Sequence, residues 1–281
     1  MKILLIGASG CFGTELQNIK LKKKKLIHFS SKKLDILDNK NLEKKIKFIK
    51  PKVIINSSAL VGINQCEIDY QNAFSINTIG ALNLAKICAK FNIILVQTST
   101  HAVFDGKQDR SYNESDTPKP NNVYSGTKYL SEVFVSSICK KYYILRFPTL
   151  YGARKNSLKG FVDKVIDALK ANKTLRIAND KIDSPTYARD AAEALISIIE
   201  KKKRFGIYHL ANEGKISYLK FVQEIKRLIK SNSKIVSVKD RNFPSLGFKP
   251  LKTSLKSKKI KLKNWKKALN QYLGNIKKDN L

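Results

Sequence analysis

Short runs of apolar residues alternate with segments of helical periodicity in the first half of the chain, and this alternation most constrains the fold. The apolar runs cover residues 2–6, 26–29, 53–55, 93–96 and 143–146. Strands that are apolar at nearly every position are buried on both faces, which is typical of a parallel sheet covered by helices. The pattern therefore predicts an α/β protein with a doubly wound parallel sheet.

A glycine-rich loop follows the first apolar run directly. Gly7, Gly10 and Gly13 form the spacing Gly-x-x-Gly-x-x-Gly before a segment with helical character. Glycine lets backbone amides approach a pyrophosphate, and the N-terminus of the helix adds positive partial charge. A tight strand–helix turn is the alternative interpretation. The position straight after an N-terminal strand favours a Rossmann-type dinucleotide site.

The end of the second strand bears on the choice of cofactor. Residues 28–33 contain no Asp or Glu that would bind a ribose diol. They do contain hydroxyl and lysine side chains, of which Ser30 and Lys32 are candidates to hold a 2′-phosphate. This composition favours NADP(H), with NAD(H) as the alternative.

After about residue 150 the alternation becomes less regular. Helical spacing recurs in residues 161–169, 190–199 and 218–229, with a short strand at 208–210. We expect residues 1–150 to form the NAD(P)-binding Rossmann domain. Residues 151–281 would form mainly a smaller C-terminal substrate lobe, partly interleaved with that domain, over the carboxyl ends of the strands.

Tyr124 and Lys128 stand four residues apart, so on a helix both side chains lie on one face. An ammonium group stabilises a phenolate, and it is expected to lower the tyrosine pKa toward the range of an acid–base catalyst. Taken alone, this spacing more often reflects one packed ring and one solvated amine. The glycine loop, which predicts a dinucleotide site in the same chain, favours the interpretation of this pair as catalytic.

The chain carries a formal net charge of +33, which raises the question of nucleic-acid binding. Arginine, the residue preferred for base and phosphate contacts, supplies only 8 of the 55 basic residues. The lysines occur throughout the chain. We predict a solvated lysine surface without a specific nucleic-acid partner, and keep as the alternative a basic face that attracts anionic substrates.

No apolar run is long enough to span a membrane, and the N-terminal one ends at the glycine loop before it could serve as a signal peptide. The four cysteines at positions 11, 66, 88 and 139 show neither metal-ligand spacing nor close pairing. We therefore expect a cytoplasmic protein without a metal site or a membrane partner.

The ordered motifs resemble those of the extended short-chain dehydrogenases/reductases, and within them the dTDP-4-dehydrorhamnose reductase family. The resemblance runs along nearly the whole chain. It rests on the glycine loop, Asn77, Asp180 and residues 34–36, 55–59, 99–106, 112–120, 124–128, 145–146, 151–152, 184–186, 208–210 and 249–255.

This resemblance implies a catalytic set of Thr100, Tyr124 and Lys128. Tyr124 would protonate the carbonyl oxygen, Thr100 would hydrogen-bond the same oxygen, and Lys128 would lower the Tyr124 pKa and hold the nicotinamide ribose. It further implies cofactor contacts at the pyrophosphate, the adenine and the middle of the cofactor. The pyrophosphate would be contacted by Gly7, Ser9, Gly10, Cys11, Phe12 and Gly13. The adenine would be contacted by Asp35 and Ile36, and the middle of the cofactor by Ser58 and Ala59.

The chain departs from the pattern of this family on the side where the sugar is expected. The family commonly has Asp and Tyr after the catalytic Thr, where this chain has His101 and Ala102. It commonly has Thr-Ser-Trp after the Arg of the following strand, where this chain has Phe147-Pro148-Thr149. Asp183 replaces a common Gly, and Lys249 replaces an Arg. His101 is either a new polar contact to the substrate or a packed residue. The predicted substrate-binding residues at these places are His101, Ala102, Phe147 and Thr149.

The resemblance predicts an NAD(P)H-dependent reductase of a nucleotide-activated 4-keto-6-deoxy sugar in surface polysaccharide synthesis, with a homodimer as one possibility. An epimerase or dehydratase of the same superfamily and a non-catalytic NADP-binding regulatory subunit are the alternatives. Other polar and aromatic residues are interpreted as structural: Glu114 and Asp116 in a loop, His28 and His209 in strands, and Trp265 as a packing anchor.

Overall fold

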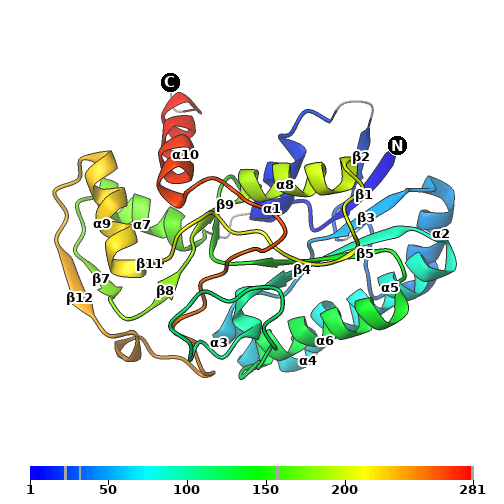
Figure 1. The fold of residues 1–281 in the computed structure, drawn as a ribbon, viewed down its shortest axis with the longest axis horizontal. Coiled ribbons are helices and arrows are strands. Elements are labelled where there is room, and N and C mark those ends of the chain that lie inside the picture. Colours follow the sequence, from blue (N-terminus) through cyan, green and yellow to red (C-terminus); the bar gives the residue numbers. More distant parts are fainter. Residues whose placement is uncertain (22–23, 32, 156–158, 280–281) are drawn as a thin grey trace.

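A six-stranded parallel sheet forms the centre of the computed structural model, which describes residues 1–21, 24–31, 33–155 and 159–279 (Figure 1). The strand order is β10-β5-β4-β3-β1-β2, and every pair is parallel. The doubly wound α/β sheet predicted from the sequence is confirmed. Its strands are β1 (Lys2–Ile6), β2 (Lys25–His28), β3 (Val53–Asn56), β4 (Ile94–Thr100), β5 (Tyr142–Phe147) and β10 (Gly206–His209).

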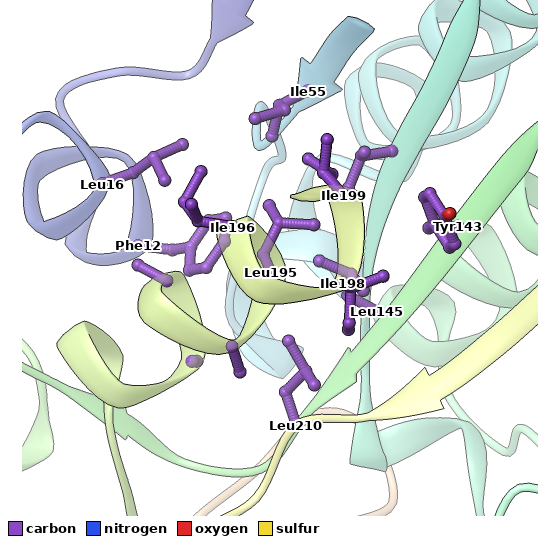
Figure 2. Close-up of a cluster of buried hydrophobic side chains, with 14 of the residues drawn as sticks. Phe12, Leu16, Ile55, Tyr143, Leu145, Leu195, Ile196, Ile198, Ile199 and Leu210 are labelled. Atoms are coloured by element: carbon purple, nitrogen blue, oxygen red, sulfur yellow. The ribbon is translucent and has the colours of Figure 1, made fainter. Parts of the chain in front are cut away.

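Helices cover both faces of this sheet, because alternate strand residues point to opposite sides. On one face, Ile3 and Leu5 of β1 join a cluster with α1 (Cys11–Gln17) and α8 (Ala188–Glu200). Figure 2 shows this cluster, with Phe12 and Leu16 from α1 beside Ile196 and Leu195 from α8. On the other face, a second cluster joins the sheet to α2 (Asn39–Ile49), α5 (Gly80–Lys90) and α6 (Val123–Ile138).

A third cluster holds together the elements drawn at the left of Figure 1. Trp265 begins the C-terminal helix α10, and its ring lies 5.8 Å from that of Phe221 in an edge-on contact. The prediction that Trp265 is a packing anchor is therefore confirmed. This part comprises α7 (Phe161–Lys170), α9 (Tyr218–Ile229), α10 (Trp265–Asp279) and the parallel pair β7 (Leu175–Ala178) and β12 (Ile235–Val238).

Four short strands link this part to the sheet. β6 (Leu150–Tyr151) pairs with β9 (Thr186–Tyr187), and β8 (Ile182–Asp183) pairs with β11 (Ile216–Ser217). Between β9 and β11 the chain returns to the sheet, where α8 covers one face and β10 adds the strand next to β5. Residues from both halves of the sequence thus build the central layer.

A π-helical turn, η1 (Ser75–Ile79), lies between α4 (Tyr70–Phe74) and α5. This turn follows α3 (Ile63–Ile68), which the sequence analysis did not predict. The Asn77 amide bonds both backbone groups of Leu60, at 2.9 and 3.0 Å. The Thr78 hydroxyl donates to the carbonyl of Thr127 at 2.9 Å, so the π turn fixes α6 against the loop after β3.

Candidate active site

The glycine loop lies at the point where the strand order reverses, between β1 and β3. Gly7 has φ +78°, and a Cβ there would come within 2.4 Å of the Ser57 carbonyl carbon. A Cβ on Gly13 would come within 2.5 Å of the Gly7 carbonyl oxygen. Both positions therefore require glycine for the close packing of the loop, whereas a Cβ on Gly10 would make only ordinary contact. Open α/β sheets bind ligands at this switch point.

A cavity of about 460 Å³ opens beside this loop. Several residues predicted to contact the cofactor line it, while Lys32 lies outside the described residues. Ala59, Gly10, Thr100, Tyr124 and Lys128 are absent from its lining in the part of the chain that the structure describes. The predicted cofactor residues in its wall are Gly7, Ser9, Ser30, Asp35, Ile36 and Ser58.

Cys11 and Phe12 turn their side chains into the core, so any contact they make with a ligand has to come from the backbone. The Phe12 ring packs 4.8 Å from the ring of Phe147, which is also buried. Burial raises the pKa of Cys11 to about 12, so this thiol stays neutral. The structure thus places Phe147 in the core rather than among polar groups that would contact a substrate.

Lys155 is a cavity residue that the sequence analysis missed. Its backbone N–H donates to the Ser9 carbonyl at 3.1 Å, and its ammonium donates to Gln17 at 2.8 Å. This contact brings a cation from the second half of the chain to the glycine loop. The sequence offered no signal for it, because lysines are spread along the whole chain.

Tyr124 and Lys128 lie on one helix, α6, as their spacing predicted. Asn122 caps this helix: its side chain accepts from the Ser125 N–H at 2.8 Å, and its own N–H donates to the Ser125 hydroxyl at 3.2 Å. Thr100 ends β4, and its hydroxyl accepts from the Ala102 N–H at 3.1 Å. The cap and the strand end therefore set the positions of the three residues predicted to be catalytic.

Burial dominates the titration of this pair. It raises the pKa of Tyr124 to about 12, against the lowering effect of a hydrogen bond to Thr100. It lowers the pKa of Lys128 to about 8, against the raising effect of Glu132. The expectation of a lowered Tyr124 pKa is wrong for this structure, because loss of water outweighs the neighbouring groups. Tyr124 keeps its proton at neutral pH and is suited to donate it.

Arg146 and Glu132 form a buried ion pair between the helix that carries Tyr124 and Lys128 and the next strand. Arg146 of β5 donates to Glu132 of α6 at 2.6 Å, and the Ser99 hydroxyl donates to the same carboxylate. The guanidinium also lies 5.1 Å from the centre of the Phe104 ring. One carboxylate thus joins β4, β5 and α6 at Ser99, the residue before Thr100.

His101 and Asp183, two departures from the family pattern, lie in contact. The His101 Nδ1 is 3.0 Å from the Asp183 Oδ1, and Oδ2 of that carboxylate accepts from the Thr149 N–H at 2.9 Å. The Thr149 hydroxyl in turn lies 2.7 Å from the Tyr218 hydroxyl. Ala102 is buried beside this group. Of the residues predicted on the substrate side, His101 and Thr149 therefore share a polar network.

Glu114 has a structural role. Its carboxylate accepts from the backbone N–H groups of His209 and Lys258, at 3.1 and 2.9 Å, and from the Ser257 hydroxyl. Asp116 pairs with Arg110 at 2.6 Å. Both carboxylates thus hold loops, as their interpretation from the sequence required. His209 lies in β10, where burial lowers its pKa to about 4.

None of the described helices is both long and apolar enough to cross a bilayer. Within the same residues, no group of three or more His, Cys, Asp or Glu side chains is arranged to hold a metal ion.

Comparison with known proteins identifies relatives along nearly the full length. A family model described as the RmlD substrate binding domain matches residues 1–278. The spore coat polysaccharide biosynthesis protein SpsK of Bacillus subtilis is 30% identical over 278 residues, covering 97% of this chain and 96% of SpsK. The dTDP-4-dehydrorhamnose reductase of Aggregatibacter actinomycetemcomitans is 28% identical over 287 residues, covering 95% of this chain and 97% of that reductase.

Solved structures agree with this relationship. A crystal structure of a dTDP-4-dehydrorhamnose reductase from Clostridium acetobutylicum has a TM-score of 0.93 and 32% identity, covering 99% of this chain and 100% of that chain. The corresponding Bacillus anthracis structure, in complex with NADP, has a TM-score of 0.92 and 27% identity, covering 98% of this chain and 99% of that chain. Because the family model spans nearly the whole chain, this protein belongs to the RmlD substrate binding domain family, as its ordered motifs predicted.

Proposed function

We propose that this protein is an NADPH-dependent reductase of a nucleotide-diphosphate 4-keto-6-deoxy sugar, of the dTDP-4-dehydrorhamnose reductase type, that serves surface polysaccharide synthesis. The full-length relatives carry that activity or a polysaccharide role in their names, and one solved relative is a complex with NADP. Residues on the sheet side would hold the cofactor, and the part built by α7, α9 and α10 would contribute to holding the sugar.

The residues present fit the cofactor. Gly7 and Gly13 keep the loop too tight for any side chain, and the cavity beside them has Ser30 at one point of its wall and Lys155 at another. The lining also contains a carboxylate, Asp35, further along the chain. We assign Lys155, at the glycine loop, to the pyrophosphate, and Ser30 to the 2′-phosphate, a contact that favours NADPH over NADH.

The buried ammonium group of Lys128 carries the proposal. Its Nζ is buried without a hydrogen-bond partner among the described residues, although a buried cation is costly unless it is paired. A group that bears this cost in the folded state is a candidate for ligand binding. We assign Lys128 to the ribose hydroxyls of the cofactor.

The mechanism follows from the three residues around the carbonyl. NADPH, held by the residues assigned above, would supply a hydride to the keto carbon when bound. Thr100 orients the carbonyl oxygen by a hydrogen bond, and Tyr124 donates its phenolic proton to that oxygen as negative charge develops. The positive charge of Lys128, on the same helix face, stabilises the phenolate that remains. The ketone becomes a secondary alcohol, and solvent then reprotonates Tyr124.

Oxidation of NADPH measured against a panel of nucleotide 4-keto sugars tests this function. We expect turnover with at least one sugar, a preference for NADPH over NADH, and a kcat about 10²- to 10⁴-fold lower in Tyr124→Phe, because a positioned general acid contributes about that much. The Tyr129→Phe variant removes a hydroxyl from the same helix outside this set and is the matched control. Unchanged turnover in Tyr124→Phe would exclude the mechanism.

We further propose that the protein works in the reducing cytoplasm. Its four cysteines are free and buried, which suits a compartment where thiols stay reduced.

A further inference from the structure

His101 and Asp183 form a dyad that joins two distant parts of the chain. They are 82 residues apart in sequence, and Nδ1 of the imidazole lies 3.0 Å from the carboxylate. The His101 side chain is 16% exposed, whereas that of Asp183 is 1% exposed. The carboxylate is therefore the buried support, and the imidazole is the partner that is partly exposed.

The carboxylate is held from several sides. Asp183 accepts from the N–H groups of Thr149 and Ser184, at 2.9 and 2.8 Å, besides its contact with His101. Burial raises its pKa, but the electrostatic interaction and hydrogen bond with His101, together with the hydrogen bonds from Thr149, bring the pKa below the ordinary value, so the carboxylate is ionised. The charged neighbour Lys181 and the phenol of Tyr218 complete its surroundings.

An ionised carboxylate can only accept a hydrogen bond, so Nδ1 of His101 has to carry the proton. In the neutral imidazole this leaves the lone pair on Nε2. Nε2 makes no hydrogen bond within the described residues, and it is not among their buried unpaired atoms. The dyad thus holds the imidazole in a fixed orientation, on the residue that follows Thr100 in the chain, and leaves Nε2 available to a ligand.

We propose that His101, oriented by Asp183, is a specificity-determining residue whose Nε2 accepts a hydrogen bond from a sugar hydroxyl close to the carbonyl that Tyr124 protonates. The chain therefore selects keto sugars with a free hydroxyl at that place over their deoxy analogues. A site built to bond a hydroxyl discriminates strongly against an analogue that lacks it, because its own polar group is then left unpaired. This inference rests on the proposed function of the same site.

The three histidines of the chain allow a direct test by ¹⁵N NMR of the imidazole nitrogens. His28 lines the cofactor cavity and is expected to respond to NADP⁺, while the buried His209 is expected to respond to no ligand. For His101 we expect a protonated Nδ1 and a bare Nε2 in the free protein. The Nε2 signal should shift when dTDP-rhamnose is added with NADP⁺, but not with dTDP and NADP⁺. The His101→Asn spectrum assigns the signal.

Variants test the same contact by kinetics. His101→Asn keeps a donor for Asp183 but lacks an acceptor at Nε2, and it should raise the KM for the keto sugar about tenfold. The KM for NADPH should stay unchanged, as should the melting temperature. With this variant, a deoxy analogue and the parent sugar should be used about equally well, whereas the wild-type protein prefers the parent.

A double-mutant cycle tests the pairing. His101→Asp alone places two carboxylates together and should impair sugar binding, and Asp183→Gly alone should leave His101 without its support. The combined variant should recover part of both losses, since the two positions are coupled.

The outcomes separate the inference from the function on which it rests. If the wild-type protein reduces keto sugars and His101→Asn does so with unchanged KM, or if dTDP-rhamnose binds without moving the Nε2 signal, His101 does not contact the sugar and the inference is wrong. Additive losses in the cycle would also contradict it. If dTDP-rhamnose fails to bind and no keto sugar is reduced, the proposed function itself is wrong.

Discussion

At the scale of single residues, Lys128 shows how the fold bears the cost of a candidate site. Burial lowers its pKa from the ordinary 10.5 to about 8, while the unfolded chain keeps the ordinary value. Between these pH values the unfolded state binds more protons than the folded state, so stability rises with pH. At neutral pH the buried charge therefore costs on the order of 3 kcal/mol.

Replacing Lys128 by Met is expected to increase the free energy of unfolding at neutral pH by ~2–3 kcal/mol, because the variant buries no charge. The gain should shrink near pH 9.5, where the folded wild-type protein already carries a neutral amine. Urea denaturation at both pH values measures the effect. Lys86→Met, on the exposed face of α5, is the control without such a gain. An equal gain in stability at both pH values would contradict the lowered pKa of Lys128.

Substitutions of Gly10 and Gly13 are expected to differ in their effects on NADPH binding and on the stability of the fold. A Cβ on Gly13 would meet the Gly7 carbonyl oxygen at 2.5 Å, so Gly13→Ala should lose about 1–3 kcal/mol of stability. A Cβ on Gly10 is 3.7 Å from the same oxygen, so Gly10→Ala should keep its melting temperature. It should nevertheless bind NADPH more weakly, as titration of NADPH fluorescence would show. Normal NADPH binding by Gly10→Ala would remove Gly10 from the predicted cofactor set.

The limits of sequence reasoning are clearest for residues in contact across long separations. The helical spacing of Tyr124 and Lys128 is a local property, and it was predictable. The contact of His101 with Asp183 depends on how the second half of the chain folds back, which no local pattern encodes. Phe147 was expected at the substrate because it belongs to a run of residues that departs from the family pattern, yet apolar burial places it against Phe12.

At the scale of elements, the pair of Arg146 and Glu132 fastens β5 to α6, and their side chains are 2% and 4% exposed. Breaking a buried pair leaves one charge without compensation, whereas replacing both partners by apolar residues removes the problem. The pair therefore matters for stability mainly through the cost of separating its members.

Glu132→Gln is expected to lower the free energy of unfolding by about 3–5 kcal/mol, because Arg146 stays charged and buried. The double variant Glu132→Leu with Arg146→Met should lose less than this single change. Glu193→Gln breaks the exposed pair with Arg189 and should cost at most about 1 kcal/mol. Denaturation curves for the three proteins test the order, and a double variant less stable than Glu132→Gln would refute it.

Most elements of the sheet followed from the sequence because their patterns are strong. Five of its strands are apolar at nearly every position, and the helices of the second half show regular apolar spacing. The π turn at Ser75–Ile79 was not predictable, since one extra residue in a helical turn hardly alters the spacing. The pairing of β7 with β12 was also missed, because both strands are short and lie far apart in sequence.

At the scale of the whole molecule, the central sheet is built from both halves of the sequence. Residues 188–209 supply α8, which covers one face, and β10, which pairs with β5. A protein cut after residue 150 would leave that face without Leu195, Ile198 and Ile199. We expect a fragment of residues 1–150 to aggregate or to lack a cooperative thermal transition, unlike the full chain. Circular dichroism and gel filtration would show this, and a stable monomeric fragment would disprove it.

The late return of the chain to its sheet also bears on synthesis at the ribosome. The first strands and helices leave the exit tunnel well before α8. The apolar face of the sheet that α8 covers in the folded protein therefore stays exposed while further residues are added. During that interval the nascent chain depends on chaperones or on rapid translation to avoid aggregation with other chains. The feature that unites the two halves of the finished molecule is thus the one that exposes it to misfolding while it is being made.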